Sequence, residues 1–218
     1  MANSAICVYG LYLGDRSEPI WGIGGKPLQD LEWAELKAVF EPEIDLHQMQ
    51  TAEPEQSLGV AIAYSEIQIQ IFAQVRSMLP WSFRSAFFPS LELFQTFLAP
   101  HSLDFTYRLG QLEGCGELSL AGKFQPTHPP TPLGGRAYFL AKKQAFAQQQ
   151  QAASVIAQLF QPQQTIWQSP RGQEQFRAIL LVKLSQLPSS LTQINQWQSE
   201  HPDWELEISQ PLPPYSFV

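Results

Sequence analysis

The chain has 218 residues and 44% hydrophobic content, enough for one large domain or two small ones. Its formal net charge is −7, with 13 Lys and Arg against 20 Asp and Glu, which argues against a surface for nucleic acid or an anionic membrane because both need clustered positive charge. Charged residues make up only 15%, and glutamine replaces many of them, which suits a protein that works inside an assembly but equally fits a glutamine-rich lineage.

The first 124 residues have the composition and periodicity of an α+β domain. Strands are expected at residues 5–13, 29–33, 36–40, 78–87 and 117–124, and helices at 57–75, 90–98 and 103–112. Pro100 is expected to separate the last two helices, and the alternation at 66–71 leaves a strand open as an alternative inside the first. The order of these elements resembles a decorated ferredoxin-like fold.

Residues 125–135 are expected to form a linker, because four prolines and a Gly-Gly pair cannot sustain a helix or an inner strand. A smaller α+β domain is expected at 136–210. Its predicted elements are a long helix at 136–160, strands at 165–168 and 176–184, a helix at 189–200 and a strand at 204–209.

The last eight residues, 211–218, are apolar and aromatic with nothing polar behind them. Their three prolines, Pro213 and Pro214 among them, favour an extended strip. Leaving the side chains of Tyr215, Phe217 and Val218 in water would forfeit several kcal/mol of favourable burial free energy. We therefore expect this tail to dock in a groove, either on its own domain or on a partner.

No residue pattern indicates a metal, a cofactor or a catalytic centre. The four histidines fall in separate loops, and Cys7 and Cys115 lie far apart in apolar runs, which favours two reduced core thiols. The glycine-rich stretch 21–26 lacks the first Gly and the final Ser or Thr of a phosphate-binding loop, and is interpreted as a turn between strands.

Glu117 is the carboxylate best placed to act as an acid. A buried Glu held by backbone donors or by an Arg is the more economical explanation. Arg84 and Arg136 are the candidate partners of this structural ion pair.

Short motifs along the chain are similar to those of the gas vesicle GvpF/GvpL family. They are Tyr9-Gly10, the segment Leu79-Pro80-Trp81-Ser82-Phe83-Arg84-Ser85-Ala86-Phe87, Glu117, the segment Gly135-Arg136-Ala137-Tyr138-Phe139-Leu140, and the ending Pro213-Pro214-Tyr215-Ser216-Phe217-Val218. The family usually has Gly where Arg84 stands, and Gly and Trp where Gln210 and Leu212 stand. The chain resembles a member of this family over nearly its whole length.

The resemblance implies a non-enzymatic accessory protein in the cytoplasm, associated with gas vesicles. Such proteins are expected to bind the hydrophobic shell protein GvpA, together with other accessory Gvp proteins, and to limit its aggregation during vesicle assembly; a minor structural component of the shell is the alternative. Trp81, Phe87, Phe88, Tyr215 and Phe217 are candidate contacts, although each of them equally fits internal packing. The N-terminus lacks a basic region, and no apolar stretch is long enough for a membrane span.

Overall fold

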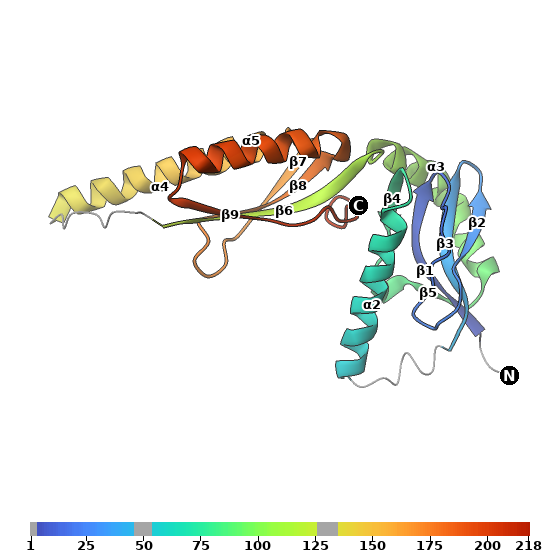
Figure 1. Cartoon of the computed structure of the whole chain (residues 1–218). Coiled ribbons are helices and arrows are strands. Elements are labelled where there is room, and N and C mark those ends of the chain that lie inside the picture. Colours follow the sequence, from blue (N-terminus) through green and yellow to red (C-terminus); the bar gives the residue numbers. More distant parts are fainter. Residues whose placement is uncertain (1–3, 46–53, 126–134) are drawn as a thin grey trace. The chain divides into compact units, whose positions relative to one another are not determined.

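The computed structural model describes residues 4–45, 54–125 and 135–218, which form two compact units (Figure 1). The first unit comprises Met1–Gly114 together with Leu212–Val218, and the second comprises Cys115–Pro211. Each unit combines an antiparallel sheet with α-helices, which confirms the α+β class. The chain thus leaves the first unit and returns to it at the C-terminal end.

The sheet of the first unit is built around β1 (Ser4–Leu13). Its other strands are β2 (Gln29–Trp33), β3 (Leu36–Asp45), β4 (Ser77–Pro80) and β5 (Phe87–Phe88), in the order β2-β3-β1-β4 with β5 pairing further along β1. Every residue from Ala5 to Tyr12 is buried. Because successive side chains of a strand point to opposite faces, both faces of β1 are covered.

Helices α2 (Pro54–Phe72) and α3 (Leu91–Gln111) cover opposite faces of this sheet. Phe88 of β5 contacts Phe94 of α3, with ring centroids 4.8 Å apart. Its neighbour Phe87 points to the other face, where it contacts Phe83, and Phe83 in turn contacts Tyr64 of α2. The two helices therefore meet the two sides of one short strand.

Pro100 does not end a helix, contrary to our expectation of two helices at 90–98 and 103–112. Helix α3 is continuous from Leu91 to Gln111, with Pro100 inside it. Phe94, Leu98 and Leu109 are fully buried on one side of the helix, before and after the proline. Tertiary packing along this face offsets the roughly 3 kcal/mol that an internal proline costs.

The second unit has the element order of a ferredoxin-like fold. Its elements are β6 (Cys115–Phe124), α4 (Gly135–Gln158), β7 (Gln164–Gln168), β8 (Phe176–Lys183), α5 (Leu187–Glu200) and β9 (Trp204–Ile208), with sheet order β7-β8-β6-β9. We expected a decorated ferredoxin-like fold in the first domain, whereas in the structure the β-α-β-β-α-β succession of that fold belongs to the second unit. Both helices lie on one face of the sheet (Figure 1), and the core between them is centred on Leu120, Ile156 and Leu180.

The boundary between the units lies at Gly114 and Cys115 in the structure, not in the predicted linker at 125–135. Strand β6, which we had assigned to the first domain, pairs with β8 and β9 of the second. Apolar alternation identifies a strand but not its partner, which depends on residues about 60 and 85 positions away. Residues 126–134 of the predicted linker lie outside the described residues.

Candidate protein-interaction site

The edge of the first sheet is interrupted where we expected one strand from residue 78 to 87. The backbone N–H of Trp81 donates to the Tyr9 carbonyl at 3.0 Å, and the N–H of Val8 donates to the Ala86 carbonyl at 2.8 Å. Between these two bonds the chain leaves the sheet and forms a short 3₁₀ turn, η1 (Phe83–Ser85). The segment that resembles the family motif is therefore an excursion from the edge strand.

Two side chains of α2 fill the gap that this excursion leaves. The Tyr64 hydroxyl lies 2.7 Å from the Val8 carbonyl oxygen and 2.9 Å from that of Trp81. The Gln68 amide donates to the Tyr9 carbonyl at 2.6 Å and to the Trp81 carbonyl at 2.9 Å. Tyr64 and Gln68 are four residues apart and share one helix face. They bond the carbonyl groups of Val8, Tyr9 and Trp81 where the chain leaves the sheet, so these buried acceptors stay paired.

Glu41 of β3 is a fully buried carboxylate beneath the glycine-rich loop between β1 and β2. Its Oε2 accepts hydrogen bonds from the Tyr9 hydroxyl at 3.1 Å and the Gly24 N–H at 3.0 Å, and its Oε1 accepts from the Lys26 N–H at 2.9 Å. The Tyr9 hydroxyl also accepts from the Ile23 N–H at 2.9 Å. These donors compensate the burial of the charge and fix the loop on the sheet.

The loop approaches Glu41 too closely for side chains at two of its positions. A Cβ at Gly22 would lie 2.0 Å from Glu41 Oε2, and one at Gly24 would lie 2.8 Å from the Ile44 methyl group. The loop is thus a turn between strands, as expected, and Gly22 is needed there because the Glu41 carboxylate occupies the space that a side chain would take.

The groups around Glu41 are held in their neutral forms. Burial raises the pKa of the Cys7 thiol above its ordinary value, and the charge of Glu41 raises it further. Burial likewise raises the pKa of Tyr9. Cys7 and Cys115 are both buried thiols, and the Cys115 thiol donates to the Gln163 Oε1 at 3.2 Å.

An aromatic cluster lies on the α3 side of the interrupted edge. The Trp81 ring makes edge contacts with Phe88, Phe94, Phe97 and Phe105 at centroid distances of 5.6–6.2 Å. The Trp81 indole N–H also donates to the Ser85 carbonyl at 3.1 Å, which ties the ring to the excursion.

Part of this cluster is open to solvent. Trp81 and Phe88 are half-buried, Phe97 is 38% exposed, and Leu93, one helical turn before Phe97, is 52% exposed. We call these four residues the α3 patch. Helix α2 carries a second exposed apolar stripe formed by Leu58, Ile62 and Ile69. The first unit therefore presents apolar helix surface on both sides of its sheet.

The predicted contact residues near the interrupted edge lie on both faces of the first sheet. Trp81 and Phe88 belong to the α3 patch, whereas Phe87 faces α2. Arg84 is exposed in η1 and is not among the residues with positive φ, so the turn accepts a side chain where the family usually has Gly.

The C-terminal tail packs on the first unit. Pro213 and Pro214 are buried, Phe217 is half-buried, and Tyr215 is exposed at 36%. Burial raises the pKa of Tyr64, and Tyr215 is among the groups that raise it further, which places the end of the tail near the α2 side of the sheet. The strip is not extended throughout, because the Phe217 N–H donates to the Pro214 carbonyl at 3.1 Å and closes a turn.

The predicted ion pair involves residues of different units. Glu117 is buried in β6, with 7% exposure, and Arg84 belongs to the first unit. The side chain of Arg136 lies outside the described side chains. The pairing of Glu117 with either arginine stays a prediction. Within the described ranges no three or more His, Cys, Asp or Glu residues are grouped so that they could hold a metal ion.

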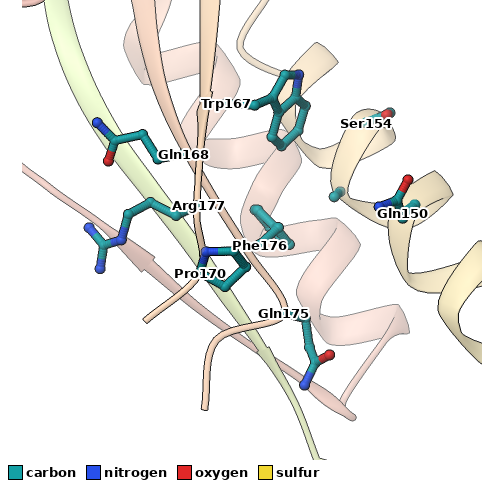
Figure 2. A pocket seen from close by; sticks show the side chains of 9 residues that line it. Gln150, Ser154, Trp167, Gln168, Pro170, Gln175, Phe176 and Arg177 are labelled. Atoms are coloured by element: carbon teal, nitrogen blue, oxygen red, sulfur yellow. The ribbon is translucent and has the colours of Figure 1, made fainter. Parts of the chain in front are cut away.

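A shallow pocket of about 300 Å³ lies in the second unit between α4 and the β7–β8 hairpin. Figure 2 shows Trp167 and Phe176 on the side of α4, near Gln150 and Ser154, whereas Gln168 and Arg177 point to the other face. Arg177 is neutralised by Glu174 and also donates to the Ser119 hydroxyl at 3.3 Å. Neutral amides and a compensated arginine offer a polar surface but no paired acid and base.

Comparison with known proteins identifies the family. The family model described as gas vesicle synthesis protein GvpL/GvpF matches residues 5–218. The chain belongs to the GvpL/GvpF family. This confirms the resemblance seen in the motifs, and the match spans both units. The sequence matches none of the curated proteins closely enough to count as a relative.

Two crystal structures of family members have the same fold. The gas vesicle protein GvpF from Anabaena sp. PCC7120 is 14% identical, with a TM-score of 0.75 over 98% of this chain and 95% of that one. GvpF from Microcystis aeruginosa is 13% identical, with a TM-score of 0.73 over 98% of both chains. None of the helices in the described ranges combines the length and hydrophobicity that a bilayer crossing requires.

Several residues that shape this site were not predicted from the sequence. Glu41 gave no clear signal, because Glu43 and Asp45 follow it closely and the glycine-rich stretch 21–26 lies about 15 residues earlier in the sequence. Tyr64 and Gln68 gave no signal either, because a polar pair at helical spacing is ordinary on a solvated face. Leu93 and Phe97 were assigned to a short helix, and their exposure depends on how α3 packs.

Proposed function

We propose that this chain is a non-enzymatic gas vesicle accessory protein that binds the hydrophobic shell protein GvpA and limits its aggregation during vesicle nucleation and assembly. Other accessory Gvp proteins are further partners in this proposal. Membership of the GvpL/GvpF family supports the gas vesicle role. The observation that carries the contact is the α3 patch, an aromatic and aliphatic surface left open on the first unit.

The chemistry of the α3 patch fits an apolar partner. A shell protein with an apolar surface aggregates unless another protein covers it. Burying the exposed parts of Leu93 and Phe97 against such a surface is favourable by roughly 25 cal/mol per Å² of apolar area. Trp81 lies beside them, and tryptophan is enriched among residues that dominate binding energy.

Hydrogen bonds also anchor the α3 patch to the sheet through Trp81. Trp81 is held through its backbone N–H and its indole N–H, and its carbonyl is bonded by Tyr64 and Gln68. A surface that is already ordered before binding loses less conformational entropy on association. Its attachment to the sheet is thus consistent with a recognition role.

The proposal is tested with purified shell protein, whose aggregation is followed by light scattering with and without this chain. Wild-type chain should delay aggregation, and Phe97→Glu should abolish the delay because it places a charge in the α3 patch. Leu103→Glu is the matched control, since Leu103 is 86% exposed on the same helix but lies on a different side of it.

The competing surface is tested in the same assay with Ile62→Glu on α2. If Ile62→Glu abolishes the delay while Phe97→Glu leaves it intact, the α2 stripe is the contact and the α3 patch is rejected. If wild-type chain neither binds shell protein in a pull-down nor delays its aggregation, the proposed function itself is rejected.

A further inference from the structure

The edge strands of the two sheets differ in how well they are protected against pairing with a further strand. Edge strands expose N–H and C=O groups that pair with other strands unless charges, prolines or interruptions prevent it. Strand β2 carries Asp30 and Glu32, and β9 carries Glu205 and Glu207. The remaining edge of the first sheet is interrupted between β4 and β5.

Strand β7 has none of these protections. Its sequence, Gln-Thr-Ile-Trp-Gln over residues 164–168, contains neither a charge nor a proline. It lies at the end of its sheet, bonded to β8 on one side only among the described strands. Ile166 is 38% exposed and Trp167 is 50% exposed. This edge is therefore open to pairing with a further strand.

The sequence of β7 is complementary to itself. If two copies align antiparallel about Ile166, Ile166 faces Ile166 and Gln164 faces Gln168, so that apolar meets apolar and amide meets amide. On the other face Trp167 lies opposite Thr165, a pairing of an aromatic and a β-branched residue that stabilises antiparallel strands. No like charges meet along the strand.

Charge distribution also favours contact through the second unit. The first unit contains 14 acidic and six basic residues, a net charge of −8. The second contains six acidic and seven basic residues, a net charge of +1. Two copies that meet through their second units avoid the repulsion that two strongly acidic first units would produce.

We propose that β7 pairs with β7 of a second copy of this chain, antiparallel and with the two-fold axis at Ile166. The two four-stranded sheets then join edge to edge, and the contact is the same patch on both copies, as closed two-fold symmetry requires. Trp167, whose outer part is open beside the pocket of Figure 2, gains a neighbour across the axis.

The oligomeric state of the purified full-length chain tests this pairing. Light scattering coupled to size-exclusion chromatography, at micromolar concentration, should give twice the 24.6 kDa mass of one chain. Ile166→Lys should give the mass of a single chain, because two lysines would face each other at the axis. Leu103→Lys, which adds the same charge to an exposed apolar position of the first unit, should keep the dimer.

Mixing variants tests the position of the axis. Ile166→Glu alone should be monomeric, and an equimolar mixture of Ile166→Lys and Ile166→Glu should regain the dimer, because only residues that face each other are rescued by opposite charges. Circular dichroism melting of each variant shows that the monomer is folded. A monomeric wild-type chain, or a dimeric Ile166→Lys variant, overturns the proposal. Failure of the mixture to dimerise overturns the axis at Ile166.

Discussion

Among single residues, Glu41 is the buried charge that holds the glycine-rich loop on the first sheet. Its carboxylate joins the inner strand β3 to Tyr9 of β1 and to backbone N–H groups of the glycine-rich loop. A buried carboxylate of this kind is stabilising only while its donors stay in place. The loop and the charge therefore depend on each other.

Replacing Glu41 should destabilise the protein. Glu41→Ala leaves the Gly24 and Lys26 N–H groups and the Tyr9 hydroxyl without an acceptor, and we expect a loss of about 2–4 kcal/mol in the free energy of unfolding. Urea denaturation followed by circular dichroism measures it. Glu43→Ala is the control, because Glu43 is exposed on the same strand and pairs only at the surface with Lys26; its effect should be within about 0.5 kcal/mol. Equal effects of the two substitutions would contradict a structural role for Glu41.

At the scale of elements, two short segments outside the main strands and helices complete the first unit. The excursion between β4 and β5 is held by α2, and the C-terminal tail belongs to the same unit although it follows the whole second unit along the chain. A terminal segment that packs against a folded unit contributes to the stability of that unit.

Removing residues 212–218 should therefore destabilise the first unit. Pro213 and Pro214 are buried, and losing their contacts should lower the free energy of unfolding by about 1–3 kcal/mol. Hydrogen exchange resolved by peptide measures this loss, which should appear in β1 and α2 and not in β8 or α5. Val218→Ser, at a half-exposed end of the tail, is the control. Unchanged exchange throughout the first unit would show that the tail is not part of its fold.

At the scale of the whole molecule, the role in assembly can be separated from permanent residence in the shell. If the chain covers the shell protein only during assembly, urea or high-salt washing of isolated vesicles should remove it, and the amount left should be small and variable relative to shell protein. Quantitative immunoblotting of washed vesicles measures this ratio. Retention at a fixed ratio after washing would identify the chain as a minor structural component instead.

Local patterns were enough to predict most elements of both units. The expected strands at 29–33 and 204–209 and the helix at 189–200 agree with β2, β9 and α5 to within two residues. Predictions failed where a distant contact decides the outcome. Pro100 lies inside α3 because buried residues before and after it share one face, and the strand expected at 78–87 is interrupted because α2 satisfies the freed carbonyl groups.

By itself, the sequence determined the family, the α+β class, the positions of most helices and strands, and the need for the apolar tail to dock, because motifs, periodicity and hydrophobicity are local properties. Only the tertiary structure decided that β6 belongs to the second unit, that the tail returns to the first, and that Glu41 is buried under the glycine-rich loop. The reason is physical: strand partners, docking surfaces and burial depend on residues far apart along the chain, and no local pattern records which of them meet.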